Sequence, residues 1–368
     1  MNQHTTVRGY RRVGGRAARL TLAAAATAAM VLGIAGMGAG AAAADTVIDT
    51  VPVGNAPFGV AITPDGSHAY VTNSDDGTVS VIETAGNTVV DTVTVGNGPV
   101  GVAVTPDGSF VYVTNGGAGF GDSVSVIETA GNTVVDTVTV GNGPSAVAVT
   151  PDGTRVYVTN ASDGTVSVIE TAGNTVVDTV TVGNGPTGVA VTPDGSHAYV
   201  TNSFDGTVSV IETAGNTVVD TVTVGNGPVG VAVTPDGSHA YVTNGGAGFG
   251  DSVSVIETAG NTVVDTVTVG NGPSAVAVTP DGTRVYVTNA SDGTVSVIET
   301  AGNTVIETVA VGTFPFGVAV TPDGSHAYVT NRDGNTVSVI AIEKCTGSLC
   351  FDFGSGTGSG TGSGSFFS

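Results

Sequence analysis

The chain lacks tryptophan, is poor in basic residues and has two cysteines. The shortages of basic residues and of cysteines limit the partners and metal sites that can be expected. Nine Lys and Arg residues stand against 31 Asp and Glu residues in 368 positions. Such an acidic surface repels phosphate backbones, so we expect no nucleic-acid partner. Cys345 and Cys350 have no histidine nearby, which makes them a poor metal site. We expect no metal and no cofactor, but the loop with Asp75 and Asp76 leaves a contact with Ca²⁺ open, although it lacks the ligand number of an EF-hand loop.

The first 44 residues have the organisation of a secretory signal peptide. Five arginines lie before residue 20, an uncharged Ala-rich run follows from 20 to 44, and three alanines at 42–44 come directly before Asp45. A basic region, an apolar region and small residues before the cleavage point define such a signal. The run is about as long as a membrane span, but it is rich in Ala and Gly, so we expect cleavage rather than a retained anchor. The arginine pair at 11–12 leaves twin-arginine export open beside general secretion.

The C-terminal residues 344–368 are predicted to form a tail outside the fold. Cys345 and Cys350 lie five positions apart, and in an exported chain we expect them to pair as a local staple. The segment 354–368 is rich in Gly, Ser and Thr, which is typical of a flexible linker.

One phrase, Tyr-Val-Thr-Asn a few residues after Thr-Pro-Asp-Gly, occurs seven times. Its tyrosines are 42 or 45 residues apart, at Tyr70, Tyr112, Tyr157, Tyr199, Tyr241, Tyr286 and Tyr328. Such periods indicate a propeller or a helical array. Each unit contains four short runs rich in Val and Thr, separated by turn sequences, and no run is long enough for a typical helix. The pattern predicts four antiparallel strands per unit, which is the blade of a propeller.

The two ends of the repeat array predict how the ring closes. The last unit lacks a fourth strand, and residues 45–55 match the fourth-strand sequence at 87–97. We therefore predict an all-β, seven-bladed propeller over residues 45–343, with the mature N-terminal strand pairing into blade seven. Closure removes the unpaired strand edge that an open array exposes.

The repeats resemble the YVTN-repeat β-propeller family. The resemblance covers residues 46–343 and rests on the Val-Thr-Pro-Asp-Gly, Tyr-Val-Thr-Asn and Val-Ser-Val-Ile-Glu sequences of each unit. It implies a secreted or cell-surface propeller, as in surface-layer proteins. At the level of the fold the chain is also similar to lactonase-type propellers and to the heavy chains of quinoprotein amine dehydrogenases. The repeated motif carries no catalytic residues that a resemblance transfers.

Internal duplication limits where a unique site can lie. Residues 74–176 and 203–305 differ at three positions, of which one places Phe204 where the first copy has an aspartate. We expect the loops after the Tyr-Val-Thr-Asn segments to share one face of the ring with the Gly-Asn-Gly-Pro links. Variable loops on a rigid scaffold are the usual place for binding. Phe204 is therefore a candidate contact, as are Phe120 and Phe249, which lie in three-residue insertions.

The most unusual residues fall at the seam between blades seven and one. Phe58 and Phe316 stand where other units have Val, Ser or Thr, Phe314 replaces a glycine of the link, and Arg332 begins the neighbouring loop. Aromatic side chains beside an arginine favour a binding site. The alternative is a hydrophobic plug that fills the seam where the end blades meet. Both interpretations stay open on the sequence.

The sequence favours a non-enzymatic propeller that is secreted or held in the cell envelope. We expect a monomer whose mature part does not span a membrane and whose variable face binds an extracellular protein or an envelope component. The competing hypothesis is a propeller enzyme of lactonase-like or quinoprotein-like type. Such an enzyme requires a unique titratable cluster near the central channel, where the predicted inner strands read Gly-Val-Ala-Val-Thr or Ala-Val-Ala-Val-Thr almost throughout.

Overall fold

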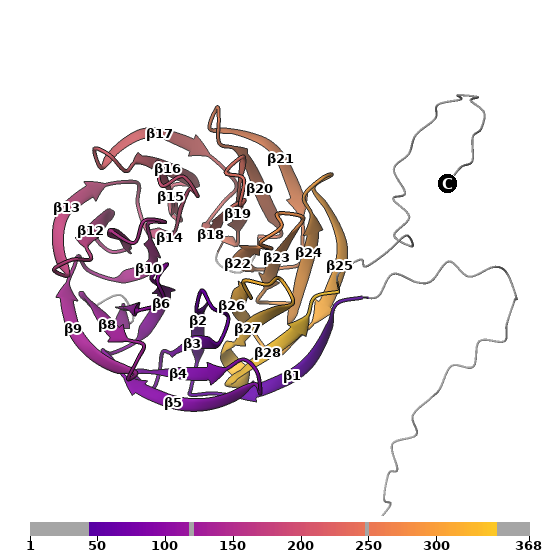
Figure 1. Cartoon of the computed structure of the whole chain (residues 1–368). Coiled ribbons are helices and arrows are strands. Elements are labelled where there is room, and N and C mark those ends of the chain that lie inside the picture. The colour runs from indigo at the N-terminus through magenta and orange to yellow at the C-terminus, as the bar shows by residue number, and fades with distance from the viewer. Residues whose placement is uncertain (1–43, 118–120, 247–249, 344–368) are drawn as a thin grey trace, which may run out of the picture. The chain divides into compact units, whose positions relative to one another are not determined.

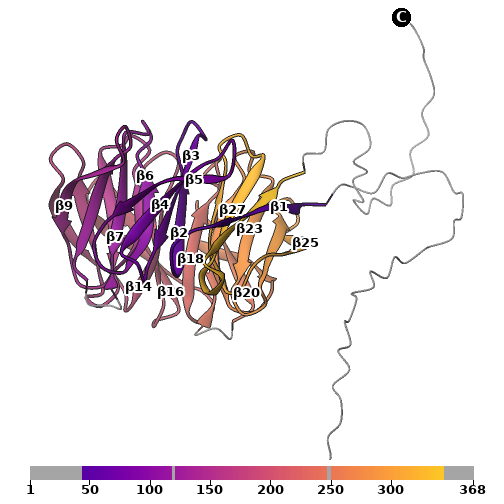
Figure 2. The same cartoon turned by 90° about the horizontal axis from the view of Figure 1, so that it is seen from below.

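A computed structural model describes residues 44–117, 121–246 and 250–343. These residues form a ring of seven separate four-stranded sheets around a central channel (Figure 1). Viewed from the side in Figure 2, the strands run between two edges of the ring, where the turns and loops lie. The predicted all-β, seven-bladed propeller is confirmed.

Each blade has an inner, a second, a third and an outer strand. The inner strands are β2 (Pro57–Ile62), β6 (Pro99–Val104), β10 (Pro144–Val149), β14 (Pro186–Val191), β18 (Pro228–Val233), β22 (Pro273–Val278) and β26 (Pro315–Val320). The second strands are β3 (His68–Asn73), β7 (Phe110–Asn115), β11 (Arg155–Asn160), β15 (His197–Asn202), β19 (His239–Asn244), β23 (Arg284–Asn289) and β27 (His326–Asn331).

The outer half of each blade follows the same order. The third strands are β4 (Thr78–Glu83), β8 (Ser123–Glu128), β12 (Thr165–Glu170), β16 (Thr207–Glu212), β20 (Ser252–Glu257), β24 (Thr294–Glu299) and β28 (Thr336–Ala341). The outer strands are β5 (Thr88–Thr94), β9 (Thr133–Thr139), β13 (Thr175–Thr181), β17 (Thr217–Thr223), β21 (Thr262–Thr268), β25 (Thr304–Ala310) and, in blade seven, β1 (Thr46–Pro52).

The ring closes by joining the two ends of the repeat array. β1 pairs antiparallel with β28, and Val51 lies opposite Val337. In Figure 1 the indigo β1 consequently lies beside the yellow β28. Blade seven thus has the strand order β1-β28-β27-β26, as the sequence predicts.

The second and third strands are buried on both faces, because each blade packs between two neighbours. In β4, Val79, Val81 and Ile82 are fully buried and Ser80 is 2% exposed. A strand with both faces covered loses the polar face that a solvated sheet shows. Small branched side chains, repeated in every blade, therefore suit this stacking.

The tyrosine of each repeat joins its blade to the next one. Six tyrosine hydroxyls donate to the side-chain oxygen of an asparagine in the following blade, in the pairs Tyr70–Asn132, Tyr112–Asn174, Tyr157–Asn216, Tyr199–Asn261, Tyr241–Asn303 and Tyr328–Asn87. These asparagines have positive φ angles of 47–49°, a conformation that Asn tolerates better than most residues. Tyr286 is different, because its hydroxyl donates to Asp45.

The threonine of each repeat makes a second connection, close to the channel. The Thr72 hydroxyl donates to the carbonyl oxygen of Val100 in the next blade and accepts from Gly59 N in its own, both at 2.8 Å. The corresponding threonine of every other blade donates in the same way. The repeated phrase is therefore the element that fastens neighbouring blades, which explains why it recurs in all seven.

The two edges of the ring differ in content. The turn edge, as we name it, holds the Thr-Pro-Asp-Gly turns before the second strands and the Thr-Ala-Gly-Asn turns before the outer strands. The loop edge holds the Gly-Asn-Gly-Pro links and the variable loops that follow the second strands, including the 3-10 helix η3 (Arg332–Gly334). The loops that vary between blades therefore follow the second strands and share the loop edge with the links, as the sequence predicts.

Candidate functional site

The central channel contains an apolar cavity of about 300 Å³. All seven inner strands contribute to its lining through their first residues. The residue after the initial proline differs between blades and is, in chain order, Phe58, Val100, Ser145, Thr187, Val229, Ser274 and Phe316. Two phenylalanines from adjacent blades therefore face hydroxyl-bearing residues of blades three and four across the ring.

Phe58 and Phe316 form an aromatic pair across the seam between blades one and seven. Their ring centroids are 3.7 Å apart, with the planes tilted by 37°. Each side chain is half-buried, and both also line the cavity. The backbone under them is fixed, since the threonine ties reach the carbonyl oxygens of Phe58 and Phe316 at 2.7 Å. The pair consequently fills part of the seam and still presents surface to the cavity.

Phe314 adopts a backbone conformation that its side chain disfavours. Its φ is +54°, and five other blades place a glycine with positive φ at this position of the link. A left-handed conformation costs about 1–2 kcal/mol for a residue with a side chain. Residues held in such conformations cluster at functional sites when the surroundings over-determine them. The strain at Phe314 therefore marks the seam independently of the aromatic pair.

Arg332 covers Phe314 from the neighbouring loop. Its guanidinium carbon lies 5.8 Å from the centroid of the Phe314 ring, and its backbone N–H donates to the Phe314 carbonyl at 3.0 Å. Within the described residues Arg332 makes no ion pair, and its buried Nε atom has no hydrogen-bond partner. In the part of the chain that the structure describes, the guanidinium is therefore not committed to an acidic side chain.

A polar hollow of about 420 Å³ borders Arg332 on the loop edge. Asp75, Asp76 and Asp333 line it. Asp76 is already engaged, because the backbone and side-chain N–H groups of Asn55 donate to its two carboxylate oxygens at 2.7 and 2.8 Å. These bonds, the backbone one first, lower the pKa of Asp76. In the described part of the chain no three His, Cys, Asp or Glu side chains are grouped so that they can hold a metal ion.

Comparison with known proteins places this ring in a family. The family model described as a lactonase, 7-bladed beta-propeller, matches three overlapping segments, 47–177, 174–304 and 255–354. These segments cover most of the sequence. The chain belongs to the lactonase family of seven-bladed β-propellers. The predicted similarity to lactonase-type propellers is thereby confirmed.

One solved structure has a similar fold. The lactonase-family propeller is similar to Kuenenia stuttgartiensis hydrazine synthase, with 26% identity and a TM-score of 0.71 over 78% of this chain and 96% of that chain. No curated protein matches the sequence.

Of the remaining sequence candidates the structure describes Phe204, which lies in a loop of another blade. Phe204 in the loop of blade four is 83% exposed, and its ring lies over Gly185, where an added Cβ meets it at 2.8 Å. Phe120 and Phe249 lie outside the described residues, as do Cys345 and Cys350. At the seam the structure shows two contacting pairs, Phe58 with Phe316 and Phe314 with Arg332. We call these four residues the seam cluster.

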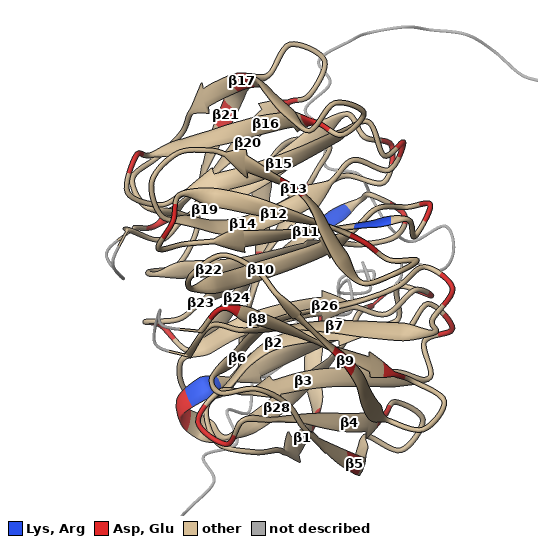
Figure 3. Ribbon diagram, turned by 90° about the vertical axis from the view of Figure 1, so that its left-hand side faces the viewer, with Lys and Arg blue, Asp and Glu red and all other residues tan. Residues whose placement is uncertain are grey.

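The charges of the lactonase-family propeller are concentrated at its edges. In Figure 3 acidic residues colour the turns and loops at both edges, and basic residues occupy few places. Within the described residues no helix has the length and apolar character needed to cross a membrane. The seam cluster thus places one of the few basic residues of the described chain beside aromatic rings on a predominantly acidic surface.

Sequence reasoning missed the surroundings of Asp45. The Asp45 side chain is fully buried and forms an ion pair with Arg284 at 3.2 Å. The signal was present in the sequence, because Asp45 occupies the position of the asparagines that the tyrosine ties use in the other blades. Aligning β1 with the other outer strands is what identifies Asp45 as the acceptor of the seventh tyrosine tie.

Proposed function

We propose that this propeller is a secreted or cell-envelope binding protein that holds its ligand at the seam cluster. One observation carries the proposal. The blades are nearly identical in sequence, and the residues that differ from the repeat at the seam form an aromatic pair at the channel with the strained Phe314 beside it. A ligand would insert an apolar group into the channel mouth against Phe58 and Phe316. Arg332 would donate to a carbonyl or carboxylate oxygen of the same ligand.

The size and charge of the site narrow the partner. A cavity of about 300 Å³ is at the small end of ligand pockets, so it accommodates one aromatic or aliphatic side chain rather than a large cofactor. The surrounding acidic surface attracts a partner with basic residues around that anchor. These features support an extracellular protein or an envelope component as the partner.

A catalytic role is the second candidate, because the matching family is named for lactonases. General acid–base catalysis needs a titratable group placed at the reacting atoms. The cavity lining consists of Phe, Val, Gly, Ala, Ser and Thr residues. Binding therefore suits this lining better than hydrolysis does. Turnover of a lactone panel by the purified protein, above the buffer rate, would favour the enzyme instead.

The binding hypothesis is tested by making the seam resemble the other blades. Phe58→Val, Phe316→Val, Phe314→Gly and Arg332→Ser introduce residues that other blades carry at the same positions. The fourfold variant should therefore fold. Both proteins are immobilised and incubated with envelope and secreted fractions of a producing cell.

The expected result is a partner retained by the native protein and lost by the folded fourfold variant. Phe204→Asp, which copies blade one and leaves the seam cluster intact, is the matched control and should retain the partner. A partner that binds the fourfold variant as well as the native protein contradicts the proposed site.

A further inference from the structure

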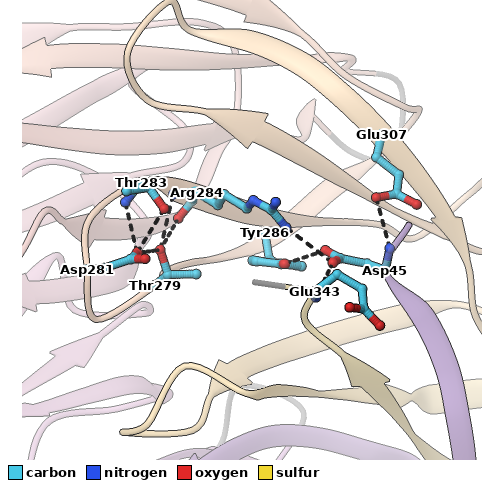
Figure 4. Close-up of polar contacts among 8 residues, drawn as sticks. All are labelled: Asp45, Thr279, Asp281, Thr283, Arg284, Tyr286, Glu307 and Glu343. Atoms are coloured by element: carbon cyan, nitrogen blue, oxygen red, sulfur yellow. Dashed lines mark hydrogen bonds and ion pairs between the residues drawn. The ribbon is translucent and has the colours of Figure 1, made fainter. Parts of the chain in front are cut away.

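The first residue of the predicted mature chain lies in a cluster of polar groups. Figure 4 shows Asp45 between β23 of blade six and the end of blade seven. Its buried carboxylate accepts from Tyr286, from Arg284 at 3.2 Å and from the backbone N–H of Glu343 at 2.9 Å. Carboxylates that are buried need such compensation. The side chain of Asp45 is thus held from three directions.

The internal repeat provides a control for this cluster. Arg155 of blade three corresponds to Arg284, yet it donates to the carbonyl oxygen of Thr213 at 2.6 Å instead of pairing with an acid. The six other tyrosine ties end on asparagine, as described above. Burial, and then the hydrogen bond to Asp45, raises the pKa of Tyr286, so the phenol remains a donor. The charged version of the tie occurs in the described structure at the ring closure.

The backbone nitrogen of Asp45 has a carboxylate partner of its own. It lies 3.1 Å from Oε2 of Glu307 on β25. The other six outer strands carry aspartate at this position, and those aspartates are exposed, whereas Glu307 is half-buried. The longer side chain of glutamate therefore reaches inward at the one place where a chain end is expected. Of the two carboxylates, that of Asp45 forms the ion pair with Arg284, whereas that of Glu307 accepts from the Asp45 backbone N–H.

We propose that the Glu307 carboxylate is the receptor for the α-ammonium group of a chain that begins at Asp45. Hydrolysis of the Ala44–Asp45 peptide bond by a signal peptidase adds water across that bond, leaving a carboxylate on Ala44 and an amine on Asp45. Protonation of this amine converts the observed N–H to Glu307 bond into an ion pair. Removal of the leader then strengthens the closure of the ring. The inference concerns maturation and is independent of the ligand proposed above.

The charge of the new amine sets a pH dependence. The groups around it are Glu307, Asp45 and Glu343, with Arg284 and Tyr286 on β23. An amine that gains a carboxylate partner has its pKa raised in the folded state. Its stabilisation is therefore complete below the unfolded value of about 8 and is lost as the pH rises through the folded value.

The first measurement is the N-terminus of the exported protein. The full chain, with its own residues 1–44, is expressed in a secreting bacterial host, and the purified product is examined by intact mass and N-terminal sequencing. We expect a chain that begins at Asp45. A product that begins at any other residue overturns the proposal.

The second measurement isolates the charge. A chain starting at Asp45 is compared with one that carries a single extra glycine before Asp45, which keeps the N–H to Glu307 bond and moves the ammonium away. At pH 6.5 the first should melt about 2–4 °C higher, and the difference should vanish above about pH 10. Glu307→Gln keeps an acceptor without charge and should remove the difference. Equal melting temperatures for the two chains, or a difference that survives Glu307→Gln, refutes the ion pair.

Discussion

The tyrosine ties allow one closure bond to be weighed against an equivalent bond elsewhere in the same ring. In Tyr286→Phe the hydroxyl that donates to the buried carboxylate of Asp45 is removed. In Tyr241→Phe the removed hydroxyl donates to the neutral side chain of Asn303 at 2.8 Å. Both rings are almost completely buried, and both changes delete one oxygen from the same position of the repeat. The packing changes are therefore nearly matched.

The expected costs follow from the charge of the acceptor. A neutral hydrogen bond contributes about 0.5–1.5 kcal/mol to the free energy of unfolding, and one to a charged group about 1.5–3 kcal/mol. Tyr286→Phe should therefore destabilise the protein by about 1–2 kcal/mol more than Tyr241→Phe. Urea denaturation followed by circular dichroism measures both free energies, and equal slopes would show that the unfolded states are comparable.

A double-mutant cycle refines this test. Asp45→Asn gives blade seven the acceptor that the other blades use, so Tyr286→Phe in that background should cost about as much as Tyr241→Phe. If Tyr286→Phe and Tyr241→Phe lower the free energy of unfolding equally in the native background, the assignment of a charged closure bond is refuted. A penalty at Tyr286 that persists in the Asp45→Asn background would attribute the effect to packing instead.

Three further predictions concern the rest of the ring. The Thr201 hydroxyl lies 2.7 Å from both Gly188 N and the Val229 carbonyl oxygen. Thr201→Val leaves these two groups without their partner and should lower the free energy of unfolding, measured by urea denaturation, by about 2–5 kcal/mol. Thr201→Ser keeps the hydroxyl and should lower it by about 1 kcal/mol. Phe204→Asp should change stability by less than about 0.5 kcal/mol in the same assay because the ring is exposed. Hydrogen bonds from threonine hydroxyls, and then from serine N–H groups, lower the pKa values of Asp65, Asp194 and Asp236 to about 2. The melting temperature should therefore fall as the pH decreases from about 4 to about 2. Replacing all three aspartates by Asn should make that fall smaller.

The fold was readable from the sequence because its information is periodic. The number of repeated tyrosines gives the number of blades, and their spacing gives the length of each blade. The match between 45–55 and 87–97 gives the closing strand. Both features depend on short-range patterns that repeat. The tie between Thr72 and Val100 was not readable, because it depends on how closely adjacent inner strands approach.

The site was readable only in part, for a related reason. Substitution at a repeated position identifies Phe58 and Phe316, but the sequence does not say that their rings meet at 3.7 Å and also face a cavity. It also does not reveal the positive φ of Phe314. The contact between Asp45 and Arg284 joins residues 239 positions apart. Only the alignment of residues 45–55 with the other outer strands points to this contact.

Blade seven, at its two interfaces with blades six and one, has two tasks that the symmetry of the repeats does not supply. A ring made from duplicated blades needs one place where its two ends recognise each other, and a binding protein needs one place that differs from the rest. Asp45 and Glu307 serve the first task at the outer side of the interface between blades six and seven, where β1 lies beside β25. The seam cluster lies on the inner side, at the channel and the loop edge. Because the two sets share no hydrogen bond in the described structure, changing the seam cluster should remove the partner and leave the closure intact, whereas Tyr286→Phe should lower stability and leave the partner bound.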